Sequence, residues 1–329
     1  MSLLKVGVLR GGPSSEYDVS LKTGKHILDI LKHPDMANVY QGIDVFIDKK
    51  GIWHVDGMPL EPYEALKRID IVFNALHGEY GEDGKVQKLL EAFAVPFTGS
   101  RALASSMMAN KKMAKDHFKA NGIKTPYHKE LLLDRTQDLE PLAHDLFRTF
   151  PMPVVVKPRG LGSSLGVSHA SNFSELLSAL DHARLFSKDV IIEEYITGKE
   201  IISGIVDDFR GVDPYTLIPV EVRHADPKTK ILDWATKQSG NVDYHAPANI
   251  SDEEKQSIDR TLKILKESLG LSHLALADFI VSPKRGVYLL EVDTQPHIHE
   301  QAPLLRALAA AGIKEHELVA HLLRLAKER

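Results

Sequence analysis

Apolar and polar positions follow two different periods along the first hundred residues. Short apolar runs at 4–9, 43–47 and 69–76 are typical of β-strands, and glycine, proline or charged residues bound them. The segments 20–31 and 84–93 carry apolar side chains at the three- and four-residue spacing of an amphipathic helix. Strands that alternate with helices favour a parallel, doubly wound sheet, so this pattern predicts an α/β unit.

The pattern changes near residue 100 and again near residue 188. A lysine-rich helical stretch ends at Asn121-Gly122, which is a helix C-cap signal. A strand at 153–157 then leads through a glycine-rich loop to a helix at 174–184. The remaining chain mixes both element types in an α+β pattern. We expect strands at 189–195, 201–207, 216–223, 274–280 and 287–292, and helices at 251–268 and 315–327.

Composition and charge are those of an ordinary globular protein. Hydrophobic residues make up 43% and charged residues 26% of the 329 residues, which excludes a disordered or collagen-like chain. No apolar run approaches the roughly 20 residues of a membrane span. The N-terminus, with Lys5 and the pair Gly11-Gly12, reads as a strand rather than a signal peptide. A formal net charge of −4 gives no reason to expect nucleic acid or a membrane as a partner.

Cysteine does not occur in the sequence. Its absence excludes disulfides, thiolate zinc sites, iron–sulfur clusters and a cysteine nucleophile. It also fits the cytoplasm, which is the location that we expect.

A glycine-rich loop follows the strand that ends in Lys157-Pro158. Its sequence is Arg159-Gly-Leu-Gly-Ser-Ser-Leu-Gly166. The glycines allow a close backbone approach, and the small hydroxyls suit a phosphate-sized anion. The loop lacks the Gly-Lys-Ser/Thr ending of a P-loop. Taken alone, it is better explained as a turn between two strands.

Three carboxylates near the ends of two apolar strands add to this signal. Asp278 belongs to one strand, and Glu291 and Asp293, two residues apart, point to the same face of the next. Carboxylates that meet across a hairpin suit Mg²⁺, which would bridge the phosphates of a nucleotide. The alternative is a set of edge-strand acids in water, which is common for one acid but less so for a cluster among apolar residues.

His77-Gly78 and Gly81-Glu-Asp-Gly84 form another glycine-rich loop, at the carboxyl end of a predicted parallel strand. Open α/β sheets bind ligands at that edge. Without the other signals, His77 is better explained as a structural histidine.

Several motifs, in order along nearly the whole chain, resemble those of the D-alanine–D-alanine ligase family. They are Gly11-Gly-Pro-Ser-Ser-Glu-Tyr-Asp-Val-Ser20, Asn74-Ala-Leu-His-Gly-Glu-Tyr-Gly-Glu-Asp-Gly84, Thr98-Gly-Ser100, Val156-Lys-Pro158 with Gly162-Ser-Ser-Leu-Gly166, Glu193 with Gly198-Lys-Glu200, and Glu291-Val-Asp-Thr-Gln-Pro296. The resemblance implies the ATP-grasp fold in three domains. These are an N-terminal α/β domain on the substrate side at 1–100, a central domain at 101–187, and a C-terminal domain with the metal ligands at 188–329.

The resemblance also implies ATP as a substrate and Mg²⁺ as the metal, with two ions expected and Mn²⁺ as an alternative. The residues that match the family's ATP site are Lys111 and Lys157 at the phosphates, Ser163 and Ser164 in the covering loop, Glu193 near the adenine, Glu200 at the ribose and Lys237 in the loop that closes over the phosphates. The matching metal ligands are Asp278, Glu291 and Asp293. The family has asparagine at the third position, and aspartate keeps the oxygen donor there.

In this family two amino acids are joined in two steps. The carboxylate of the first attacks the γ-phosphate of ATP and gives an acyl phosphate, and the amine of the second then attacks that carbonyl and releases phosphate. The resemblance assigns Glu16, Ser163 and Lys237 to the reacting centre, with Glu16 at the first substrate's ammonium group. It assigns His77 to a position beside that substrate. It further implies a role in peptidoglycan synthesis and, by analogy, a homodimer.

The chain departs from the family where the amino acids would bind. Leu276 replaces an arginine that steadies the tetrahedral oxyanion, Ala302 replaces a serine that holds the second substrate's carboxylate, and Gln238 replaces a loop tyrosine. His297 and His299 stand where glycine and threonine are usual. Removal of one oxyanion-hole donor costs about 10²–10³-fold in rate, so the change at residue 276 is a large one unless another donor replaces it.

Arg223, His297 and His299 are the candidates to replace that donor. We assign His297 to substrate binding. A metal site at the two histidines ranks below this assignment, and polar loop residues without a role are the simplest explanation of both.

Three functions therefore stay open on sequence grounds. The first is a D-alanine–D-alanine ligase with compensating residues, and the second is a related carboxylate–amine ligase that joins a different pair. The third is a catalytically weak nucleotide-binding protein. Because the departures are confined to the amino-acid half, we favour an active ligase with an altered second substrate, and the prediction is of the reaction class rather than of the substrate pair.

Overall fold

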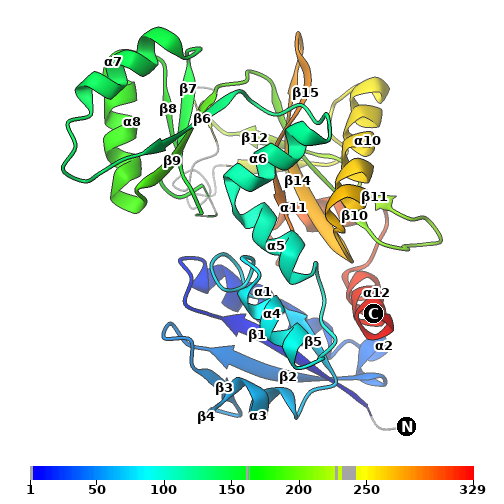
Figure 1. Ribbon diagram of the computed structural model, residues 1–329. Helices are drawn as coiled ribbons and strands as arrows, with labels where there is room; N and C mark the ends of the chain where they lie inside the picture. The colour runs from blue at the N-terminus through cyan, green and yellow to red at the C-terminus, as the bar shows by residue number, and fades with distance from the viewer. Residues whose placement is uncertain (1–2, 161, 163, 227–228, 232–241) are drawn as a thin grey trace.

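The computed structural model describes residues 3–160, 162, 164–226, 229–231 and 242–329. Within these residues the strands form three sheets of five, four and six strands. In Figure 1 the five-stranded sheet is at the bottom, the four-stranded sheet is at the upper left, and the six-stranded sheet is at the upper right.

The five-stranded sheet contains the N-terminal strands that the sequence predicts. Its strands are β1 (Leu4–Gly11), β2 (Tyr40–Ile47), β3 (Trp53–Val55), β4 (Met58–Leu60) and β5 (Ile71–Asn74), in the order β4-β3-β2-β1-β5. As predicted, β1 is parallel to β2 and to β5. The antiparallel strands β3 and β4 were not predicted, because three-residue strands are too short to show a period.

Helices from both ends of the chain cover this sheet. They are α1 (Tyr17–Ile30), α2 (Pro34–Ala37), α3 (Pro62–Leu66), α4 (Lys85–Ala92) and α12 (Glu315–Glu328). Helix α12 contacts α1, α2 and β5, and its Leu322 belongs to the same buried cluster as Val6 and Phe73. The C-terminal helix therefore packs on the N-terminal sheet (Figure 1).

The four-stranded sheet has the order β6-β9-β7-β8 and is antiparallel throughout. Its strands are β6 (His128–Leu132), β7 (Val154–Pro158), β8 (Ser168–Ala170) and β9 (Asp189–Glu194). Helices α7 (Glu140–Thr149) and α8 (Phe173–Phe186) pack on it around a core that includes Leu146, Val156 and Leu180. Two helices, α5 (Ala102–Ala109) and α6 (Lys111–Ala120), precede this sheet in the chain.

The six-stranded sheet is antiparallel, with the order β13-β12-β10-β14-β15, and β11 pairs with β10. Its strands are β10 (Lys199–Val206), β11 (Tyr215–Thr216), β12 (Val220–His224), β13 (Val242–His245), β14 (Leu274–Ser282) and β15 (Gly286–Asp293). The helices of this part are α10 (Asp252–Leu269) and α11 (Pro303–Ala310). A capping box at Ser251 and Glu254 starts α10, and Gly270 in the left-handed region ends it.

The division at residues 100 and 187 stays a prediction. Strand β9 pairs with β6 and β7, and β10 opens the next sheet. None of the helices in the described part of the chain combines the length and the apolarity that a membrane span needs.

The loop that follows β1 and leads to Glu16 begins at a backbone turn that only glycine fits. Gly11 has a φ of +92°, and a Cβ added there would lie 2.2 Å from the carbonyl oxygen of Ile47. Its N–H donates to Ser20 Oγ at 2.8 Å, and that hydroxyl donates to the carbonyl of Ala75 at 2.7 Å. The ends of β1 and β5 are thus tied together where the loops to Glu16 and His77 leave the sheet.

We predict that Gly11→Ala destabilises the protein far more than Gly51→Ala, its matched control. Gly51 also has a positive φ, of +82°, but an added Cβ meets nothing within 4 Å. The control therefore loses only about 1–2 kcal/mol of unfolding free energy to backbone strain. Gly11→Ala adds a backbone clash, which costs about 1–3 kcal/mol more. Urea unfolding of both variants measures the difference, and equal midpoints would contradict the tight turn.

Candidate active site

One cavity of about 540 Å³ brings most of the predicted site residues together. A second cavity of about 230 Å³ shares part of its lining, so the two form one cleft. The residues that line the first are Glu16, Lys111, Lys157, Glu193, Asp278, Glu291, Asp293 and His297 among others. The second is lined in addition by Ser164 and Glu200. Three of the residues named from the sequence lie outside the described part of the chain. They are Ser163 and Lys237, which are predicted site residues, and Gln238, which departs from the family.

The three acidic residues of the hairpin share one face of the sheet. Asp278 in β14 pairs with Glu291 in β15, and Leu276 pairs with Asp293 two positions on. Residues opposite each other in an antiparallel pair point to the same side. The register shifts between Asp278 and Phe279, which makes Leu290 an extra residue of β15. The cavity wall therefore offers three carboxylates on one face, a set of oxygen donors that fits Mg²⁺.

A buried carboxylate in β9 organises the cationic side of the cleft. Glu193 is 2% exposed, and its carboxylate lies 2.9 Å from Lys157 Nζ and 3.0 Å from Lys115 Nζ. Burial raises the pKa of Glu193, but the two ammonium groups outweigh it and lower the pKa to about 2. Glu193 is therefore ionised, while burial lowers the pKa of Lys115 against the opposing effect of this carboxylate.

Lys115 is a residue that the sequence argument missed. Its Nζ also donates to Thr125 Oγ1 at 2.9 Å and to the carbonyl of Leu290, the extra residue of β15, at 3.3 Å. It thereby joins α6 to the strand that carries the acidic residues. A signal was present, because Lys115 follows Lys111 by four residues and so lies on the same helix face.

Lys111 starts helix α6 and reaches toward the acidic hairpin. Asn110 caps the helix by accepting from the N–H groups of Lys112 and Met113 at 3.1 and 3.3 Å. The Nζ of Lys111 lies 3.5 Å from Glu291 Oε2. The helix start thus places an ammonium group beside a carboxylate of β15.

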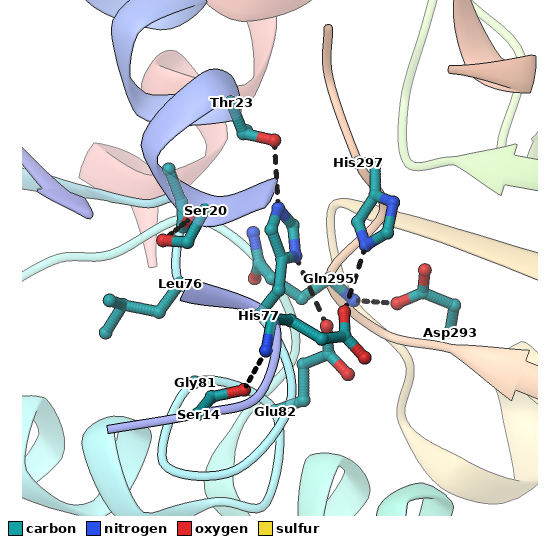
Figure 2. A network of polar contacts seen from close by, with 12 residues as sticks. Ser14, Ser20, Thr23, Leu76, His77, Gly81, Glu82, Asp293, Gln295 and His297 are labelled. Carbon is teal, nitrogen blue, oxygen red and sulfur yellow. Dashed lines mark hydrogen bonds and ion pairs between the residues drawn. The ribbon is translucent and has the colours of Figure 1, made fainter. Parts of the chain in front are cut away.

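The other end of the cleft is formed by the loops after β1, β5 and β15. Glu16 is 5% exposed, and its Oε2 lies 3.3 Å from His297 Nε2. His77 is fully buried; its Nε2 contacts Thr23 Oγ1 at 3.0 Å and its Nδ1 contacts Glu82 Oε1 at 3.2 Å. Figure 2 shows His77, Glu82 and His297 directed toward one another. Glu16 and His77, which the resemblance assigns to the first substrate, both lie against His297.

A pair of amide side chains fixes the last of these loops. The Asn74 amide donates to Gln295 Oε1 at 3.3 Å, and Gln295 Nε2 donates to the carbonyl of Asn74 at 2.5 Å. Gln295 N–H also donates to Asp293 Oδ1 at 2.8 Å. The end of β5 therefore holds the chain after β15, and His297 follows two residues later.

Carboxyl groups are crowded at this end of the cleft. Burial raises the pKa of Glu82 to about 8, and the charge of Glu16 adds to the effect. Burial likewise raises the pKa of Asp293 to about 7, with a contribution from Glu82. Burial lowers the pKa of His77 to about 4, so its imidazole is neutral at pH 7. The arrangement favours a cationic group among these side chains. Glu82 was not identified from the sequence as a site residue, because this residue appeared there only as part of the glycine-rich loop Gly81-Glu-Asp-Gly84.

Two of the departing residues are apolar and buried. Leu276 is 7% exposed and lines the larger cavity, and Ala302, which precedes the lining residue Pro303, is 1% exposed. Arg223 lies outside the residues that line the two cavities, and its guanidinium donates to Glu221 at 3.1 and 3.2 Å. Burial lowers the pKa of His299 to about 4, which leaves its imidazole neutral. Among the three candidates, only His297 lines the large cavity.

Two family models match the chain. One described as D-ala D-ala ligase C-terminus matches residues 118–324, and one described as D-ala D-ala ligase N-terminus matches residues 56–100. The chain is 32% identical over 329 residues to the D-alanine–D-alanine ligase of Carboxydothermus hydrogenoformans, with 99% of both chains covered. It is 34% identical over 322 residues to that of Geobacter sulfurreducens, with 97% of this chain and 93% of that one covered.

Solved structures of the same kind match in fold. A D-alanine–D-alanine ligase from Bacillus anthracis complexed with ATP matches with a TM-score of 0.78 at 27% identity, covering 99% of this chain and 98% of that one. The D-alanyl-alanine synthetase A of Vibrio cholerae matches with a TM-score of 0.83 at 23% identity, covering 100% of both. With its ATP-grasp fold, the chain belongs to the D-alanine–D-alanine ligase family, whose members are ATP-dependent ligases.

Proposed function

We propose that the protein joins two amino acids, with D-alanine as both substrates, at the expense of ATP and through an acyl phosphate. One observation carries this proposal. A single cleft holds Lys111, Lys157 and the acidic hairpin at one end and the buried acid Glu16 at the other. The lysines and the hairpin suit the phosphates of a nucleotide together with their metal ion. Glu16 suits the ammonium group of an amino acid.

The phosphates of ATP bind between the cationic side chains and the acidic hairpin. Lys157 and Lys111 neutralise phosphate oxygens, and Ser164 of the loop that follows Lys157 lines the same cleft. Asp278, Glu291 and Asp293 would hold Mg²⁺, which would supply positive charge to the transferred phosphoryl group. Chemistry of this kind depends on position and charge more than on a protein nucleophile.

At the other end, Glu16 binds the ammonium group of the first amino acid and so directs its carboxylate toward the γ-phosphate. Gly162 leaves room for this acid, since a Cβ at residue 162 would lie 2.2 Å from Glu16 Oε1. The phosphate loop and the ammonium-binding residue are thus in contact. That contact supports transfer of a phosphoryl group to the amino acid's carboxylate.

A second candidate is a ligase of the same chemistry with a different acceptor. Leu276 and Ala302 favour it, because both are apolar and buried where the resemblance expects groups for an oxyanion and a carboxylate. Under this candidate the ATP half is unchanged and the second substrate differs from D-alanine.

We place the reaction in the cytoplasm and assign the dipeptide to peptidoglycan synthesis. ATP use and the absence of cysteine support the location. A homodimer is proposed by analogy with the family.

The first test measures phosphate release from Mg·ATP with and without D-alanine. We expect release that requires D-alanine, together with D-alanyl-D-alanine in the mass spectrum. Mg·ATP binding without any D-alanine-dependent release would reject D-alanine as the substrate and favour the second candidate. Failure to bind Mg·ATP would contradict the ATP site itself.

We predict that Lys157→Ala and Glu291→Gln each reduce phosphate release by at least about 10²-fold, because each removes a charge that faces the phosphates or their metal. The fold should persist in Lys157→Ala, since Lys115 still neutralises Glu193. Lys129→Ala is the matched control. This lysine is half exposed on β6 and, among the described residues, forms an ion pair with Asp145, at 4.0 Å, so its loss should leave turnover unchanged. Normal turnover by either site variant would show that the phosphate and metal assignments are wrong.

Leu276→Arg should increase D-alanine ligation, by up to about 10²–10³-fold if the guanidinium supplies the missing oxyanion donor. Leu276→Met is the control, because it keeps the volume and adds no charge. The measurement is kcat for D-alanine-dependent phosphate release. An unchanged kcat in a folded arginine variant would show that the native leucine does not limit this reaction.

A further inference from the structure

Two histidines and a glutamate at the amino-acid end of the cleft have possible metal-ligand atoms that lie close together. One imidazole nitrogen each from His77 and His297 and one carboxylate oxygen of Glu82 all lie within 4.8 Å of one another. His77 is fully buried, and Glu82 and His297 are partly buried. The donors come from two loops that are more than 200 residues apart in sequence, the one after β5 and the one after β15 (Figure 2).

The distances fit the spacing of ligands around a small cation. Zinc bonds of about 2.0–2.1 Å in a tetrahedron place neighbouring ligand atoms about 3.3–3.5 Å apart. His77 Nδ1 lies 3.2 Å from Glu82 Oε1, close to that spacing, and the ligand atoms of His77, Glu82 and His297 all lie within 4.8 Å of one another. A cation that binds all three would therefore draw these atoms together.

The orientation of the two rings also fits a shared ion. The rings of His77 and His297 meet edge-on, with centroids 4.2 Å apart and planes inclined by 70°, so they are not stacked and their in-plane lone pairs are compatible with a shared ion. A second cluster in the described residues, His33 with Asp35 and His316, shows the opposite geometry. The rings of His33 and His316 are stacked with an angle of 14° between their planes, and lone pairs in nearly parallel planes do not converge.

The partners of the remaining ring nitrogen fix His77 in place. Its Nε2 contacts Thr23 Oγ1 at 3.0 Å. In the tautomer with the proton on Nε2, the ring donates to this hydroxyl and directs the Nδ1 lone pair at Glu82. Metal-binding histidines commonly have such a partner on the other nitrogen, because it sets the tautomer and the ring orientation.

We propose that His77, Glu82 and His297 bind a divalent transition-metal ion, with zinc as the best fit, at the amino-acid end of the cleft. Imidazole nitrogens together with a carboxylate suit zinc, cobalt and nickel, whereas Mg²⁺ prefers oxygen ligands alone. The site uses other residues than the acidic hairpin that would hold Mg²⁺ in the proposed function, and its Glu82 and His297 act electrostatically on Asp293 of that hairpin. It does not depend on the protein's being a ligase.

An ion here would change the charge at the amino-acid end. Glu16 contacts His297 directly, so a bound cation would be held within reach of its carboxylate. A substrate ammonium group and the metal ion would then compete for one group of acids. Zinc would in that case act as an antagonist of amino-acid binding.

The test is a titration of the metal-free full-length protein with Co²⁺, without nucleotide or amino acid. Four-coordinate cobalt with imidazole ligands absorbs far more strongly in the visible range than cobalt held by oxygens alone, so weak binding at the acidic hairpin is distinguished. We expect a strong band that saturates at one equivalent and that Zn²⁺ abolishes. Absence of such a band in the unaltered protein would overturn the proposal.

Variants locate the ion. His297→Gly should weaken binding by more than about 100-fold, since even the loss of a residue that only orients a ligand costs about 10–100-fold. Glu82→Gln is the second variant and should also lose the strong band, which keeps the test informative if one variant does not fold. His316→Ala in the other cluster is the matched control and should bind as the unaltered protein does. A band that survives in His297→Gly or disappears in His316→Ala would overturn the assignment.

Discussion

The buried carboxylate of Glu193, held between two lysines, is the interaction on which the rest of the cleft depends. An uncompensated ammonium group inside a protein costs several kcal/mol, so neither Lys115 nor Lys157 would stay buried without this acid. Glu193 itself is fixed by strand pairing with β6 and β7. Through Lys115 the same ion group reaches the carbonyl of Leu290 in β15. Electrostatic interactions therefore hold the four-stranded sheet, helix α6 and the acidic hairpin in fixed positions relative to one another.

The two ends of the cleft differ in how fully their charges are matched. At the nucleotide end, Lys111 and the Glu193 group face the acidic residues of β14 and β15, so charges of both signs are present before any ligand binds. At the amino-acid end, the carboxyl groups of Glu16, Glu82 and Asp293 crowd around the imidazoles of His77 and His297, while Leu276 gives the neighbouring wall an apolar side chain. The first end is suited to a strongly charged ligand of fixed shape. The second requires its ligand to bring positive charge.

Much of the fold could be read from the sequence, because apolar periodicity is a local property. Long elements such as α1, α10 and β14 were predicted nearly to their ends, whereas β3, β4 and β13 were missed because they have only three or four residues. The motifs also led to the residues that line the cleft. Lys115 and Glu82 were missed for a different reason. Their importance comes from partners far away in the chain, Glu193 for Lys115 and His297 for Glu82, and although Lys115 shares a helix face with Lys111, local spacing does not report such distant contacts.

The reciprocal amide contact between Asn74 and Gln295 has a consequence for how the protein can be rebuilt. It joins a segment from the first quarter of the chain to one from the last tenth, and helix α12 packs on the same N-terminal sheet. The N-terminal sheet and the chain after β15 thus form one structural unit that the sequence interrupts with two other sheets. A chimera that exchanges the first hundred residues with those of a relative would separate the two halves of this unit. Exchanging residues 295–329 together with them would preserve it.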